Sequence, residues 1–168
     1  MLTIVPVTDE SNDLAEIRRL YLSAFPANER RRFRDLVDDP SGGSELVTLY
    51  DGELFCGFAC FLNALDISHI IYFAIEENLR DRGYGSAALK AIGEYKRGRR
   101  ILVDIELETP SAVNNDQRRR RKSFYLRNGY KQTPVRYHWR GEDYEILSTG
   151  GNITDEEYEN FWETLYGE

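Results

Sequence analysis

The sequence contains few of the residues that support a disulfide or a metal centre. Cys56 and Cys60 are its only cysteines. On a strand they would share one face, too far apart along the chain for an easy disulfide. Neither cysteine has further Cys or His residues nearby at the spacing of a metal site. We therefore expect two buried free thiols, a reducing compartment and no bound metal.

Long apolar runs and an excess of basic residues are also missing. The longest nearly apolar stretch, Leu54–Leu65, is too short to span a bilayer, and "LTIVPVTDE" at the N-terminus lacks the basic region of a signal peptide. The net charge of −7 argues against a general nucleic-acid binder, which usually carries a basic face. These absences predict a cytoplasmic protein with neither a membrane nor a nucleic acid as its partner.

The chain does contain the composition and patterning of an α/β domain. With 168 residues, 41% of them hydrophobic, it is long enough for one domain over residues 1–168. Apolar patterns predict strands at 1–7, 45–50, 53–64, 68–76, 100–108, 135–141 and 144–149. Helical spacing and capping residues predict helices at 11–25, 28–39, 84–96, 114–129 and 154–167. Their order predicts a mixed, mostly antiparallel sheet flanked by helices.

A glycine-rich turn, "RDRGYGSAA", separates the strand at 68–76 from the helix that follows it. The N–H groups at a helix N-terminus are unpaired and attract anions. Gly83 and Gly85 lack the Cβ atoms that would keep a phosphate away, and Arg80 and Arg82 add positive charge. The turn therefore predicts an anion site, with a solvated turn that binds nothing as the alternative.

Two known phosphate motifs compete for this turn. A Walker-type loop is excluded, because the chain has no Gly-Lys pair. The stretch "GYGSAA" fits the G-x-G-x-x-G/A fingerprint, with Asp104 near the end of the next strand, which leaves a dinucleotide-binding oxidoreductase open. Against that reading, "EENLRDR" intervenes between Ile75 and Gly83, and the chain supplies only one βαβ unit.

The longer segment "AIEENLRDRGYGSAAL" resembles the acyl-CoA-binding signature [R/Q]-x-x-G-x-[G/A] of the GNAT acetyltransferase superfamily, through Arg80, Gly83 and Gly85. The preceding strand, the helix, the next strand and "SFYLRNGY" follow in the family's order, within residues 65–130. The resemblance implies a single GNAT-type domain, with its acyl-CoA site at the splay between the fourth and fifth strands. It also implies acetyl-CoA as co-substrate and no metal.

The same resemblance assigns the cofactor contacts. It implies that backbone groups of Phe73, Ala74 and Ile75 bind the pantetheine arm. It implies that the turn binds the pyrophosphate, through Arg80, Arg82, Gly83, Tyr84, Gly85 and Ser86. In this family an amine attacks the thioester directly, so the protein orients both reactants, accepts a proton and stabilises the departing thiolate.

Three residues are the main candidates for proton transfer. Tyr125, in "SFYLRNGY", matches the tyrosine that protonates the leaving thiolate in many relatives, and a core aromatic is the plain alternative. His69 stands where histone-type members carry their catalytic glutamate, and a structural histidine is the plain alternative. Glu106 competes with His69 as the base, on an acidic strand face shared with Asp104 and Glu108, and a solvated face is its alternative.

The acceptor is less well defined. Glu29, in "FPANERRRF", lies in a segment that usually edges the acceptor site in this superfamily, and a capped helix start with its arginines in solvent is the plain alternative. The net negative charge favours a cationic amine. The basic run at 118–122 is expected to contact CoA phosphates or the acidic strand, and Arg118 departs from the asparagine of many relatives. His138 is a weaker candidate base. The prediction is an N-acetyltransferase, monomeric or homodimeric. A non-catalytic acyl-CoA-binding module and a protein–protein module are the alternatives.

Overall fold

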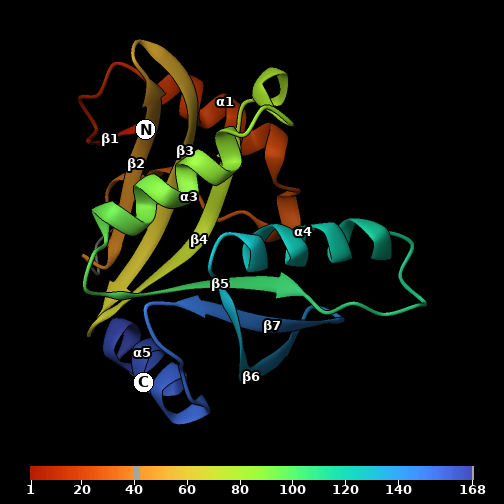
Figure 1. The fold of residues 1–168 in the computed structure, drawn as a ribbon. Coiled ribbons are helices and arrows are strands. Elements are labelled where there is room, and N and C mark those ends of the chain that lie inside the picture. The colour runs from red at the N-terminus through yellow and green to blue at the C-terminus, as the bar shows by residue number, and fades with distance from the viewer. Residues whose placement is uncertain (40–41, 168) are drawn as a thin grey trace. The chain divides into compact units, whose positions relative to one another are not determined.

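The computed structural model describes residues 1–39 and 42–167, and Figure 1 draws it as a ribbon. The chain divides into two compact units, Met1–Asn63 with Ile70–Arg97 and Ala64–His69 with Gly98–Glu168. Strand β4 (Ile67–Ile75) begins in the second unit and continues in the first. Each unit therefore has its own strands and helices.

The first unit is built on antiparallel strands. Its strand order is β1 (Thr3–Pro6), β2 (Ser44–Asp51), β3 (Leu54–Ala64) and β4. The pairs β1–β2 and β2–β3 are antiparallel, and Gly52 at φ +61° forms the hairpin turn that "DG" predicts. The helices are α1 (Leu14–Ala24), α2 (Phe33–Val37) and α3 (Tyr84–Tyr95), with 3-10 turns η1 (Ala27–Glu29) and η2 (Glu77–Leu79). The helix predicted at 28–39 is thus reduced to α2 after η1.

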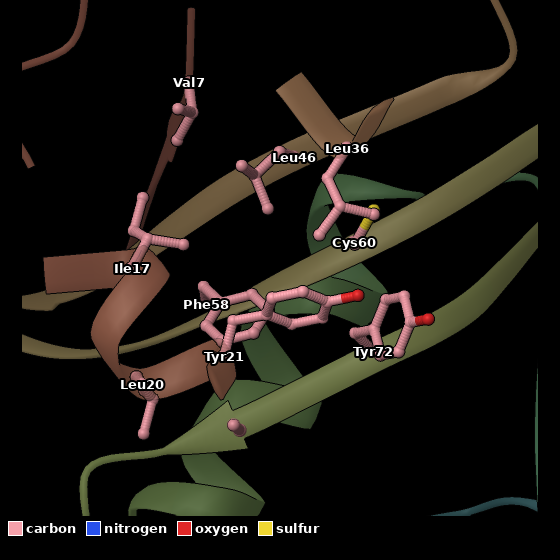
Figure 2. Packing of buried hydrophobic residues seen from close by; sticks show 10 residues of the cluster. Val7, Ile17, Leu20, Tyr21, Leu36, Leu46, Phe58, Cys60 and Tyr72 are labelled. Atoms are coloured by element: carbon pink, nitrogen blue, oxygen red, sulfur yellow. The ribbon is translucent and has the colours of Figure 1, made fainter. Parts of the chain in front are cut away.

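Two apolar clusters pack on these strands, and Figure 1 shows α1 and α3 on opposite sides of them. One cluster joins α1 and α2 to β2–β4, and it includes the predicted helical stripe Ile17, Leu20 and Tyr21 (Figure 2). The other cluster joins α3 to the strands through buried residues such as Leu49 and Ala88. Burial of these stripes, more than intrinsic propensity, stabilises the short helices.

Both cysteines are free and buried, as predicted, but they do not share one apolar face. Cys60 belongs to the cluster of α1 and Cys56 to the cluster of α3. The reason is a β-bulge: Leu49 pairs with Gly57 and the next residue of β2 pairs with Phe55, which leaves Cys56 as the extra residue. A bulge reverses the alternation of side chains along a strand.

The second unit contains the mixed part of the sheet. The first residues of β4 are followed in order by β5 (Arg100–Glu106), β7 (Glu142–Thr149) and β6 (Lys131–Trp139). The β4–β5 pair is parallel, whereas β5–β7 and β6–β7 are antiparallel. The helices are α4 (Asn115–Arg127) and α5 (Asp155–Tyr166). The predicted mixed, mostly antiparallel sheet with flanking helices is confirmed. Among the described residues, no helix has the length and apolar character that a membrane span requires.

Candidate active site

The predicted anion site lies at the N-terminus of α3, in the first unit. The chain leaves β4, passes through η2 and a turn with Asp81 at φ +62°, and reaches Gly83 at φ +82°, a conformation that glycine adopts without strain. Gly83 is the N-cap residue, so no cap side chain bonds the first N–H groups, and the first turn contains no acidic residue. Because neither a capping side chain nor an acidic side chain compensates it, the positive end of the α3 dipole is suited to an anion.

Contacts within the first unit hold this turn in place. Leu79 is buried against α3. Arg80 Nε donates to the carbonyl oxygen of Ile75 at 3.2 Å, which closes the loop between strand and helix. Tyr84 Oη donates to Asp51 Oδ2 at 2.9 Å and ties the start of α3 to the β2–β3 hairpin. The predicted pyrophosphate residues thus form a turn whose backbone is supported on both sides.

The predicted pantetheine-binding residues form the end of β4. Ala74 is buried, while Phe73 and Ile75 are half-buried against the cluster of α3. A Cβ atom on Gly57 would lie 2.1 Å from the Ala74 carbonyl oxygen, so β3 approaches this stretch as closely as only glycine permits. One edge of the predicted pantetheine strand is therefore held firmly by β3.

Tyr125 lies on α4, in the second unit, and is half-buried. Its ring packs against Phe124 and Tyr130, with ring centroids 5.3 and 5.4 Å away. Burial raises the pKa of Tyr125 to about 12, an effect that the positive charge of Arg121 opposes. The phenol is therefore protonated at neutral pH, which the predicted proton donor requires.

His69, also in the second unit, is a buried histidine, with 2% of its side chain exposed. Its Nε2 lies 3.6 Å from Asp104 Oδ1, beyond hydrogen-bond distance. Within the described residues neither ring nitrogen has a hydrogen-bond partner. The rings of Phe161 and Trp162 on α5 pack edge-on against it, each with centroids 5.9 Å away. Buried polar atoms without partners are rare, so this imidazole is a candidate for function.

Asp104 and Tyr137 complete this cluster. The sequence named Asp104 only within the competing dinucleotide fingerprint and on the acidic strand face, and it did not name Tyr137. Tyr137 on β6 donates a hydrogen bond to Asp104 Oδ2 and stacks on Tyr144, with centroids 5.0 Å away. Burial acts to raise the pKa of Asp104, but the adjacent His69 and the Tyr137 hydroxyl bring it below its usual range. Asp104 is therefore a carboxylate beside the imidazole. The acidic strand face was a signal for Asp104, whereas no local pattern indicates that Tyr137 reaches it.

Glu106, the rival base, is held by arginines. Its carboxylate lies 2.8 Å from Arg118 and 3.7 Å from Arg121. Arg118 is 5% exposed and also donates to Asn114 Oδ1 and to the Leu107 carbonyl oxygen, both at 2.9 Å. The predicted contact between the basic run and the acidic strand is thus present. At the position of the family's asparagine, this chain has a buried arginine that joins α4 to β5.

The remaining candidates lie at the surface. His138 is exposed, and its Nδ1 lies 2.7 Å from Asp143 Oδ1. Glu29 is exposed at the end of η1, and its carbonyl oxygen accepts a hydrogen bond from Tyr72 Oη at 2.7 Å. Over residues 1–39 and 42–167, no three His, Cys, Asp or Glu side chains are grouped as a metal ion would require.

Residues 42–132, more than half of the chain, match the family model of the acetyltransferase (GNAT) domain. The match runs from β2 to the start of β6, so it includes the turn before α3 and the helix of Tyr125. Among curated proteins, none matches the chain.

Solved structures share the fold at low sequence identity. A protein assigned to the GNAT acetyltransferases, from Bacteroides thetaiotaomicron, has a TM-score of 0.79 and 23% identity, over 94% of this chain and 92% of that one. A Bacillus subtilis acetyltransferase in complex with CoA has a TM-score of 0.60 and 20% identity, over 92% and 100%. A spermidine N-acetyltransferase chimera from Vibrio cholerae has a TM-score of 0.64 and 13% identity, over 88% and 94%. At these identities the likeness is one of fold.

Proposed function

Because the chain belongs to the GNAT family of acetyltransferases, we propose that it transfers the acetyl group of acetyl-CoA to a primary amine, by direct attack of the amine on the thioester in a ternary complex. The observation that carries this proposal is the N-terminus of α3. Its N-cap residue, Gly83, has no side chain that could cap the helix, and its first turn contains no acidic residue. A helix end of this kind favours phosphate groups. The anion in the proposal is the pyrophosphate of acetyl-CoA.

The residues around this helix end fit that role. N–H groups of Tyr84 and Gly85 belong to the first turn, where helix geometry provides no acceptor within the helix. The exposed Arg82 would add charge-assisted hydrogen bonds, and backbone groups of Phe73–Ile75 would bind the pantetheine arm. Bound acetyl-CoA supplies the activated carbonyl carbon and the thiolate leaving group.

We assign the proton acceptor to His69 rather than to Glu106. A cationic amine first loses one proton to solvent, which frees the lone pair that attacks the thioester. Formation of the C–N bond then releases a second proton, and its proposed acceptor is His69, whose Nε2 lies 3.6 Å from the Asp104 carboxylate. The Glu106 carboxylate is already engaged by Arg118 at 2.8 Å and by Arg121 at 3.7 Å, so it is less available to the amine. Because His69 is 2% exposed, a water molecule would carry the proton to it.

Tyr125 is the proposed proton donor. Cleavage of the C–S bond leaves a thiolate, which takes a proton from the Tyr125 hydroxyl. The raised pKa of this phenol, about 12, keeps it protonated until that step. The phenol is restored when the proton accepted from the amine is returned through solvent.

The proposed acceptor is a cationic amine that Glu29 contacts with its exposed carboxylate. One of the structures that share the fold is named as a spermidine N-acetyltransferase chimera, so a polyamine is among the acceptors to test. We propose that the enzyme acts in the cytoplasm, as a monomer or homodimer. Two free, buried thiols fit a reducing compartment of this kind.

Thiol release from acetyl-CoA tests the proposal. The wild type is assayed with spermidine, with kanamycin and with a peptide that has a free amino terminus, beside His69→Gln, Tyr125→Phe and Glu106→Gln. We expect amine-dependent thiol release, and a fall in kcat of about 100-fold for His69→Gln and Tyr125→Phe with thermal stability intact. Acetyl-CoA binding without release for any amine would reject the transferase assignment. A larger loss in Glu106→Gln than in His69→Gln would move the base to Glu106.

A further inference from the structure

Two tyrosines in the core of the first unit form hydrogen bonds, through their hydroxyl groups, with a segment at the surface. Tyr21 on α1 is 1% exposed and Tyr72 on β4 is 6% exposed, and both belong to an otherwise apolar cluster. Their rings meet edge-on, with centroids 4.9 Å apart, and Figure 2 shows the two hydroxyl oxygens pointing the same way out of the cluster. A phenylalanine at either position would fill the same space without a polar atom.

Three hydrogen bonds join these two hydroxyls to the backbone of residues 29–31. Tyr72 Oη donates to the Glu29 carbonyl oxygen at 2.7 Å and accepts from the Arg31 N–H at 3.0 Å. Tyr21 Oη donates to the Arg31 carbonyl oxygen at 2.8 Å. Burial and the neighbouring Tyr72 raise the pKa of Tyr21 far above its usual range, so this hydroxyl stays a neutral donor.

Residues 29–31 need such partners because they lie between helices. The chain is extended at Arg30, after η1 ends at Glu29, and α2 begins only at Phe33. Backbone groups in a segment of this kind would otherwise bond to water. The hydroxyls therefore fix the main chain from the inside, while the Glu29 and Arg31 side chains are exposed.

We propose that Tyr21 and Tyr72 are positioning residues for the acceptor amine: their hydroxyls hold residues 29–31 so that Glu29 meets the amine in one geometry. The inference rests on the proposed function, because Glu29 is the proposed acceptor contact. A carboxylate on a fixed backbone loses less entropy when it binds than one on a mobile loop. Neither tyrosine touches acetyl-CoA in this scheme, so the effect is confined to the amine.

Tyr72→Phe removes two of the three hydrogen bonds and Tyr21→Phe removes the third, and both keep the ring. The matched control is Tyr50→Phe, which loses a 2.8 Å hydrogen bond to Asp13 in the same unit, away from residues 29–31. The probe is whichever of spermidine, kanamycin and the free-amine peptide the wild type acetylates fastest. The readouts are KM for that amine, KM for acetyl-CoA, and hydrogen exchange of the Arg31 amide.

For Tyr72→Phe we expect KM for the amine to rise about fivefold to tenfold, with KM for acetyl-CoA unchanged and with faster exchange at Arg31. Tyr21→Phe gives a smaller rise, and Tyr50→Phe gives none. Faster exchange without a change in KM for the amine would overturn the inference, and so would equal changes in both KM values or in the control. A wild type that binds acetyl-CoA but acetylates no amine would instead reject the proposed function, and this inference with it.

Discussion

Helices α3 and α5 each have twelve residues, but side chains cap the N-terminus of α5 and not that of α3. In α5, Thr154 and Glu157 form a capping box, and three acidic residues occupy the first turn. Arg100 adds an ion pair to Glu157 at 2.7 Å. In α3 the cap is Gly83, which offers no side chain, and the first turn has no acidic residue.

This difference indicates that the N-terminus of α5 contributes to stability, whereas that of α3 is available for binding. The capping box satisfies backbone N–H groups of α5 from within the chain, a contribution of about 1 kcal/mol to folding. The corresponding groups of α3 receive no such side-chain cap, and the helix instead depends on burial of residues such as Ala88 and Ile92. We interpret the missing cap as the place that the pyrophosphate of acetyl-CoA occupies.

The largest effect is expected from an acidic side chain at the α3 terminus. Gly85→Glu should lower the affinity for acetyl-CoA by about 100-fold, because it puts a carboxylate where the pyrophosphate is proposed to bind. Calorimetric titration with CoA measures this loss, and the melting temperature without CoA checks the fold. Gly85→Ala is the control for added size without added charge. Lys90→Gln is the control for charge, because it also makes the net charge one unit more negative but does so at an exposed position further along the same helix. Unchanged affinity in Gly85→Glu would remove the pyrophosphate from this turn.

A smaller loss of affinity should follow removal of the positive charge beside the turn. Arg82→Ala should weaken CoA binding about tenfold and make it less sensitive to salt, since one charge-assisted contact is lost. Titrations at two salt concentrations measure both effects. Arg97→Ala is the control, because Arg97 is also exposed but lies beyond the C-terminal end of α3. Equal effects of the two substitutions would show that only the overall charge matters.

At the other helix, Thr154→Ala should lower stability and leave binding alone. Loss of the capping hydroxyl should reduce the free energy of unfolding by about 1 kcal/mol, or the melting temperature by about 2–4 °C. Thr154→Ser keeps the hydroxyl and should behave like the wild type. Chemical denaturation measures the change, and titration with CoA should give the wild-type affinity. A fall in affinity would contradict the assignment of α5 to stability only.

The smallest expected effect is a dependence on pH. The Arg100 hydrogen bond, then the Thr154 backbone, hold the pKa of Glu157 below its usual range. A depressed pKa in the folded state contributes stability above the unfolded pKa of about 4.3, and that contribution is lost as pH falls through the folded value. Glu157→Gln should therefore melt slightly below the wild type at pH 6, with the gap closing below about pH 4. A gap that persists at low pH would show that the charge of Glu157 is not its source.

Much of the fold could be predicted because its signals are local. "DG" at Asp51 and Gly52, the acidic first turn of α5 and the glycine end of α3 all act within a few residues along the chain. The bulge at Cys56 could not be predicted, because it depends on how β2 and β3 pair.

The candidate site divides in the same way. The turn at Gly83 and the phenol of Tyr125 follow from a motif and from residue chemistry. The ion pair that engages Glu106 was foreseen only as a contact between charged segments. The Tyr137–Asp104 hydrogen bond joins residues 33 positions apart, and no pattern in β5 or β6 alone specifies it.

By itself, the sequence determined the order of the helices and strands and the uncapped end of α3, because hydrophobic periodicity, turns and helix caps depend on residues that are close together in the sequence. Only the tertiary structure decided that the His69 side chain is buried beside Asp104, and that the hydroxyls of Tyr21 and Tyr72 bond to the backbone of residues 29–31. The physical reason is that burial and strand register are set by side chains distant in sequence, whose packing no local pattern contains.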